Sequence, residues 1–273
     1  MQKQEEIVNK LDKEEKLALA ASLNAAAEPW AEQIGIPRVD FYDFATENGG
    51  FYPAVPALVQ TWDTELASDI MQDLASKTEK KGLFCLKNMG VKDNPYREGI
   101  SEDPYVCGAA AESFARGIRK AGMIPCFSGY VPKSGADEVP LSQMREVFLS
   151  PLYSKPQREC TVYRENFPNT DQSYTDWSKL LHSAAEKNGF IIDEKGSDLS
   201  AGNILLDGDR EMLRAAAEKD GAQILDKAAE QAICLALECA GAKAKNGESF
   251  DREKYALRAA EESAVLLKNK FML

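Results

Sequence analysis

Residues 105–127 read YVCGAAAESFARGIRKAGMIPCF, and this stretch shows the repeat unit from which the fold can be inferred. A helical pattern over 105–121 ends at Gly122, and an apolar β-type run follows directly. Glycine is common just after a helix because it adopts the left-handed conformation at little cost. The same alternation predicts strands at 38–44, 82–87, 123–127, 160–163, 190–192 and 203–206, and helices near 63–80, 105–121, 141–149 and 176–187. Alternating strands and helices predict an α/β fold with a parallel sheet.

The two ends of the chain differ from its middle. Residues 1–34 and 221–273 are Ala-rich and charged, with helical patterns and no strand between the helices. Asp12 and Asp251 each precede such a pattern and are predicted helix N-caps. We therefore expect a single domain over 1–273, made of a helical lead-in over 1–34, a β/α core over 35–220 and C-terminal helices over 221–273.

The composition is acidic, with 33 Lys and Arg against 44 Asp and Glu and a formal net charge of −11 over 273 residues. Such a charge opposes binding to the phosphate backbone of nucleic acids and to anionic lipid. No apolar run approaches the ~20 residues of a membrane span, and the first residues do not resemble an export signal. We expect a cytoplasmic protein that binds neither nucleic acid nor membrane.

Cysteine and histidine do not predict a metal site. The six cysteines form no Cys-x-x-Cys pair, and the single histidine, His182, has no partner at metal-ligand spacing. Cys85 and Cys234 lie in apolar runs, where a reduced thiol acts as a small core residue. We expect buried free thiols, a helix-surface His182, no metal and no cofactor.

Six short segments, in order along the chain, carry a resemblance to a known family. They are Gly35-Ile-Pro-Arg-Val-Asp-Phe-Tyr-Asp43, Phe51-Tyr-Pro53, Thr61-Trp-Asp-Thr-Glu-Leu-Ala67, Ser101-Glu-Asp-Pro-Tyr-Val-Cys-Gly108, Met144-Arg-Glu-Val-Phe-Leu-Ser-Pro151 and Glu261-Glu-Ser-Ala-Val-Leu-Leu-Lys-Asn269. Together they resemble the N-terminal barrel domain of glycoside hydrolase family 3, which includes β-glucosidases. The resemblance implies a TIM-type (β/α) barrel, here with missing or shortened elements, that binds sugar at the C-terminal ends of its strands. We expect the family's second domain to be absent from this chain.

The resemblance also assigns two carboxylates. Asp43 falls at the family's substrate-binding aspartate, although Phe44 replaces the glycine that follows it. Asp198, in Ser197-Asp198, falls near the family's SDW motif and is the candidate nucleophile of a retaining glycosidase. Leu199 replaces the tryptophan of that motif, and the alternative is that Asp198, or its neighbour Asp193, is a solvated turn carboxylate.

Three further residues match sugar-binding positions in part. Glu98 keeps its place in a loop that resembles the family's GRNFE, and Arg97 stands two residues from the arginine position of that motif. Tyr163 matches a site tyrosine, and the equal alternative is a core tyrosine at the end of a strand. The family's Lys-His pair is replaced in Pro125-Cys-Phe127, and no residue here is assignable as the general acid.

The resemblance implies hydrolysis of O-glycosyl bonds in β-glucoside- or xyloside-type sugars, with a small carbohydrate as ligand. The missing Lys-His pair leaves two alternatives open. One is a catalytically impaired carbohydrate-binding or regulatory protein. The other is one half of a split two-chain glycosidase, in which a partner chain or a second copy replaces the missing domain.

Overall fold

The structure of the protein is a computed structural model. It describes residues 2–44, 49–78, 82–87, 89, 100–101, 103–128, 161–165, 189–193, 204–206, 208–221, 223–244 and 250–264. The predicted helices at 141–149 and 176–187, together with Cys160 and His182, lie outside these residues. Among the described helices, none combines the length and the apolarity that crossing a bilayer requires.

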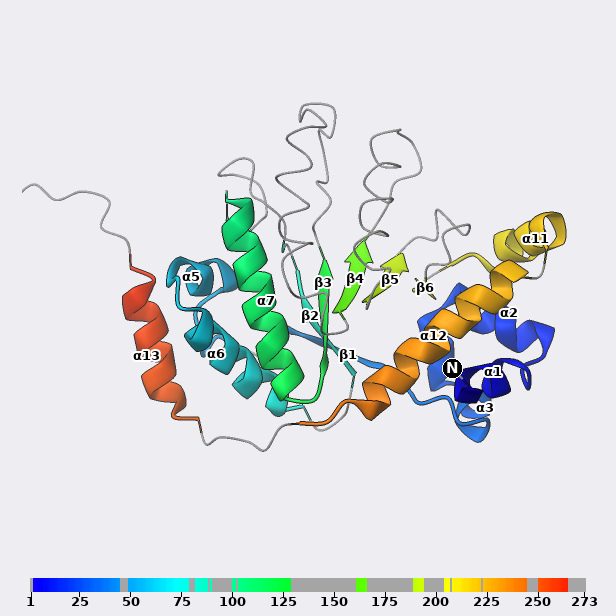
Figure 1. Ribbon diagram of the computed structural model, residues 1–273, viewed down its shortest axis with the longest axis horizontal. Coiled ribbons are helices and arrows are strands. Elements are labelled where there is room, and N and C mark those ends of the chain that lie inside the picture. The colour runs from blue at the N-terminus through cyan, green and yellow to red at the C-terminus, as the bar shows by residue number, and fades with distance from the viewer. Residues whose placement is uncertain are drawn as a thin grey trace, which may run out of the picture.

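A six-stranded parallel sheet forms the centre of the described structure (Figure 1). Its strands follow chain order from edge to edge: β1 (Asp40–Asp43), β2 (Gly82–Leu86), β3 (Ile124–Ser128), β4 (Thr161–Glu165), β5 (Gly189–Asp193) and β6 (Ile204–Leu205). Each strand pairs in parallel with the next. The predicted α/β fold is confirmed as a curled half-barrel, and the described residues do not form a closed barrel.

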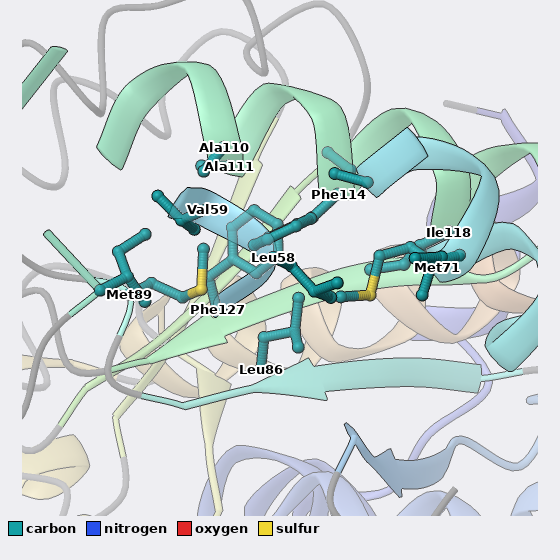
Figure 2. Packing of buried hydrophobic residues seen from close by; sticks show 14 of the residues in the cluster. Leu58, Val59, Met71, Leu86, Met89, Ala110, Ala111, Phe114, Ile118 and Phe127 are labelled. Carbon is teal, nitrogen blue, oxygen red and sulfur yellow. The ribbon is translucent and has the colours of Figure 1, made fainter. Parts of the chain in front are cut away.

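One face of the sheet, the α7 face, is covered by α5 (Val55–Gln60), α6 (Thr64–Ser76) and α7 (Pro104–Lys120). Figure 2 shows the core beneath these helices, where Leu58, Met71 and Phe114 pack above Leu86 and Phe127 of the sheet. Alternate residues of a strand point to opposite faces. Phe84 and Leu86 therefore join this cluster, whereas Leu83 and Cys85 join the cluster on the other face.

The opposite face, the α12 face, is covered by helices from both ends of the chain (Figure 1). They are α1 (Gln2–Val8), α2 (Lys13–Ala21), the short 3₁₀ helix η1 (Leu23–Ala27), α3 (Pro29–Gln33), α11 (Arg210–Asp220) and α12 (Gln223–Gly241). Ile233 and Leu235 of α12 are fully buried in one cluster with Cys126 and Val162 of the sheet. The helices of residues 2–33 together with α11 and α12 therefore form one layer on this face.

Side-chain caps fix the starts of several helices. Asp12 accepts a hydrogen bond from the backbone N of Glu15 at 2.8 Å, and the Glu15 carboxylate accepts one from the backbone N of Asp12 at 2.9 Å. Asp251 accepts a bond from the backbone N of Lys254 at 3.2 Å. Both N-caps expected from the sequence are confirmed. Each satisfies a backbone N–H that the helix itself leaves unpaired.

The last described helix, α13 (Arg252–Glu262), is fastened to α6 by a buried carboxylate. Arg252 Nε lies 3.0 and 2.9 Å from the two oxygens of Asp73, and Arg252 Nη2 lies 3.0 Å from Oδ1. The hydroxyl of Tyr52 donates to Asp73 Oδ2 at 2.9 Å. Ala259 is the fully buried residue of α13, so polar contacts carry much of its attachment.

Candidate functional site

The carboxyl ends of the parallel strands meet at one edge of the sheet, where ligands bind in folds of this class. Polar and charged residues close several strands at this edge. They are Asp43 at the end of β1, Lys87 directly after β2, Ser128 at the end of β3, Glu165 at the end of β4 and Asp193 at the end of β5. This edge is the candidate site.

Asp43 and Lys87 form an ion pair across the first two strands. Lys87 Nζ lies 2.5 Å from Asp43 Oδ2. Asp43 is in register with Cys85 of β2. Lys87 follows Cys85 by two residues and therefore lies on the same face of the sheet. The side chains are 30% exposed for Asp43 and 62% exposed for Lys87. The pair therefore presents a carboxylate and an ammonium group to solvent at the site edge.

The backbone after Lys87 is held against the next strand. The backbone N of Met89 donates to the backbone oxygen of Ser128, the last residue of β3, at 2.9 Å. The Met89 side chain is fully buried in the core on the α7 face. These two anchors limit where Lys87 can reach. Lys87 was not among the site residues predicted from the sequence. The sequence feature that indicates it is a charged residue directly after a buried apolar strand.

Asp193 closes β5 and is fully buried. It pairs with Glu165 on one side and with Leu205 on the other. Its backbone oxygen accepts a hydrogen bond from the backbone N of Leu206 at 3.2 Å. The interpretation of Asp193 as a solvated turn carboxylate is therefore wrong, because the residue belongs to the sheet. Asp193 lies two residues after Ile191, so strand alternation puts it on the α7 face, opposite to the face of Asp43 and Lys87.

Tyr163 lies within the core instead of beside Asp43. Its side chain is 2% exposed and belongs to the apolar cluster of the α7 face, next in register to Phe127 and Ile191. Burial raises the pKa of the Tyr163 hydroxyl above its ordinary value. Asp43 shares the register row of Cys85, whose side chain belongs to the cluster on the α12 face. The placement favours the core-tyrosine interpretation.

The remaining predicted site residues, Asp198, Arg97 and Glu98, lie outside the described residues. The structure thus brings together Asp43 and Lys87 and places Asp193 at the same edge. The proposed roles of Asp198, Arg97 and Glu98 remain predictions from the sequence.

A cavity of about 200 Å³ lies between α5, α6 and α7. Trp62 and Tyr105, both more than two-thirds exposed, contribute to its lining. Two of its polar side chains, Asp63 and Ser113, already have partners within the protein. Asp63 caps α6 and pairs with Arg258, and the Ser113 hydroxyl donates to the backbone oxygen of Thr64. A sugar needs polar groups that turn toward it, so this cavity is not the candidate site.

Comparison with known proteins relates the chain to β-glucosidases. No protein-family model matches the sequence. β-Glucosidase B of Emericella nidulans is 25% identical over 231 residues, which cover 74% of this chain and 27% of that protein. Thermostable β-glucosidase B of Acetivibrio thermocellus is 23% identical over an alignment that covers 97% of this chain and 42% of that protein. The chain spans less than half the length of these relatives.

Solved structures of β-glucosidases share the fold. The glycoside hydrolase family 3 β-glucosidase of Bifidobacterium adolescentis matches with a TM-score of 0.72 and 21% identity, over 96% of this chain and 45% of that one. β-Glucosidase 3B of Thermotoga neapolitana, solved in complex with α-D-glucose, matches with a TM-score of 0.69 and 19% identity, over 98% of this chain and 48% of that one. The chain is thus similar in sequence to β-glucosidases, and it shares the fold of glycoside hydrolase family 3 β-glucosidases.

Proposed function

We propose that this chain carries the sugar-binding half-barrel of a retaining β-glycosidase, which hydrolyses O-glycosyl bonds of β-glucoside- or xyloside-type sugars. The observation that carries the proposal is the position of Asp43. It lies partly exposed at the carboxyl edge of a parallel sheet whose fold matches family 3 β-glucosidases. A solved relative of this fold holds glucose, which supports a sugar as the ligand.

The chemistry needs two carboxyl groups about 5–5.5 Å apart. One carboxylate attacks the anomeric carbon, and the bond to the leaving oxygen breaks as an acid protonates that oxygen. Water then cleaves the glycosyl-enzyme bond and releases the sugar. We propose a single domain over residues 1–273, as expected from the sequence. No residue is assigned as the general acid.

Asp198 is the candidate for the attacking carboxylate and is supported by its resemblance to the family's Ser-Asp motif. Asp193 is not assigned this role, because it is fully buried and lies on the α7 face, opposite to the face of Asp43. Arg97, Glu98 and Asp43 are the proposed sugar-binding residues. We do not assign Tyr163 to the sugar, because its side chain is buried in the core.

The test is release of nitrophenol from a panel of aryl β-glycosides. These leaving groups need little acid assistance, so a site without its general acid still registers. We expect turnover that the nucleophile variant abolishes, with Asp193→Asn and Asp198→Asn compared at equal concentration. A 2-deoxy-2-fluoroglycoside, whose covalent intermediate is long-lived, labels the attacking aspartate for peptide mass mapping. Absence of turnover by the wild type on every aryl glycoside contradicts the hydrolytic function.

A further inference from the structure

The Asp43–Lys87 pair differs from the Arg252–Asp73 and Arg38–Asp40 pairs in where it lies. The Arg252–Asp73 pair fastens two helices and buries its carboxylate, which is 5% exposed. The Arg38–Asp40 pair, with N and O 2.8 Å apart, lies at the opposite end of β1 from the site edge. Asp43 and Lys87 instead lie at the ligand edge, with both side chains partly open to solvent.

Such a pair contributes little to the stability of the fold. Exposed ion pairs are typically worth less than about 1 kcal/mol, because water screens the charges and the side chains lose freedom. Lys87 is 62% exposed, so solvent replaces much of what the lysine loses without its partner. The stability of the fold therefore does not depend on this pair, and both charged groups stay at the ligand edge.

The chemistry of the pair fits two neighbouring hydroxyl groups. A hydroxyl group donates one hydrogen bond and accepts others, a carboxylate only accepts, and an ammonium group only donates. A carboxylate beside an ammonium group can therefore accept from one hydroxyl and donate to the next. Both bonds involve a charged group and are stronger than neutral ones.

We propose that Lys87 is a specificity-determining residue, which together with Asp43 binds two adjacent hydroxyl groups of an uncharged sugar ring. The proposal rests on the proposed glycosidase function and names its substrate class as neutral glycosides. The two opposite charges of the pair sum to zero. An anionic group on the sugar gains from Lys87 but is repelled by Asp43 at nearly the same distance, so a neutral ring is favoured.

The experiment uses Lys87→Met and Asp43→Asn, with Arg38→Met as the matched control. Arg38 is 61% exposed, which is comparable to Lys87. It pairs with Asp40, which lies at the end of β1 opposite to Asp43. Binding of methyl β-glucoside is measured by calorimetry, and KM and kcat are measured with nitrophenyl β-glucoside and β-glucuronide. Melting temperature is recorded for every variant.

We expect Lys87→Met to weaken glucoside binding about tenfold or more, while Arg38→Met binds the glucoside like the wild type. The melting temperatures of both variants should equal that of the wild type. A deoxyglucoside that lacks the hydroxyl contacted by Lys87 should bind to Lys87→Met with nearly the same affinity as the glucoside does. Asp43→Asn leaves the Lys87 charge without its partner carboxylate. We therefore expect this variant to raise the ratio of glucuronide to glucoside kcat/KM about tenfold.

Each outcome decides between the two proposals. Unchanged glucoside affinity in Lys87→Met overturns the role of Lys87 even if the wild type is active. An equal loss of affinity in Arg38→Met also overturns it, because the effect is then not local. A wild type that binds glucoside through Lys87 without turnover supports this inference and overturns the hydrolytic function. A wild type that neither binds nor turns over overturns both.

Discussion

Replacing Asp73 tests whether a buried carboxylate attaches α13 to the rest of the fold. Asp73 is 3% exposed and lies at the centre of a polar cluster beneath α13. It accepts hydrogen bonds from Arg252 and from the hydroxyl of Tyr52, and Lys77 Nζ lies 3.7 Å away. In the variant Asp73→Asn, the shape of the side chain is kept and its charge is removed.

The expected loss follows from these contacts. Hydrogen bonds to a charged group are worth about 1.5–3 kcal/mol, and a broken buried pair costs about 3–5 kcal/mol. Arg252 is 45% exposed, so water recovers part of that loss, and the asparagine oxygen still accepts from Tyr52. We expect Asp73→Asn to lower the free energy of unfolding by about 2–3 kcal/mol. Asp73→Leu also strands the buried Tyr52 hydroxyl and should cost about 1–3 kcal/mol more.

Urea denaturation and thermal melting measure this loss, with Asp69→Asn as the control. Asp69 lies one turn earlier on α6, and its contacts to Tyr255 at 3.4 Å and to Lys120 at 3.7 Å are longer. We expect the control to lose less than about 1 kcal/mol. Arg252→Met completes a double-mutant cycle, in which the pair should show a coupling energy of at least about 1 kcal/mol. A variant Asp73→Asn within about 0.5 kcal/mol of the wild type would show that this carboxylate does not hold α13 to the fold.

Three further predictions concern packing, thiol reactivity and alkaline stability. Gly117→Ala should lose about 1–3 kcal/mol in urea denaturation, because its Cβ would lie 2.0 Å from a backbone oxygen of α6, whereas Gly241→Ala, with nothing within 4 Å, should lose nothing. A thiol reagent at pH 8 should label Cys234, which is half-buried, before Cys107, because burial raises the pKa of the Cys107 thiol to about 12; peptide mass mapping gives the order. Burial raises the pKa of Tyr163, so above pH ~10 the unfolded chain ionises first and stability should fall with rising pH; denaturation between pH 8 and 11 should show a smaller fall in Tyr163→Phe.

The sequence predicts β2 and β3 well because these strands are buried on both faces. The runs at 82–87 and 123–127 are apolar apart from Lys87, and both are found as strands with nearly the predicted bounds. The helix expected over 105–121 is α7, and its start is fixed by the cap at Asp103. A continuous apolar run needs no knowledge of its neighbours to be recognised as a buried strand. The buried thiol expected in such a run is confirmed for Cys85, which is in no disulfide, whereas Cys234 is half-buried.

The candidate site is less predictable because it depends on register. Asp43 and Lys87 are 44 positions apart, and they meet only because Asp43 pairs with Cys85. Tyr163 was open to two interpretations because the short run around it does not reveal which residues face which side. A shift of one residue in register would have exchanged the two faces. Pairwise register is a tertiary property, and the local pattern does not contain it.

The packing of the α12 face limits where a sugar can bind. Leu83, Val162 and Ile192 on this face are fully buried in one cluster with Ile233 and Leu235 of α12. A sugar could enter that layer only by displacing close-packed apolar side chains, which would cost several kcal/mol for each large residue moved. The described part of the sheet therefore leaves its carboxyl edge for the ligand. Both the carboxylate expected from the sequence and the lysine found beside it lie at that edge, partly exposed.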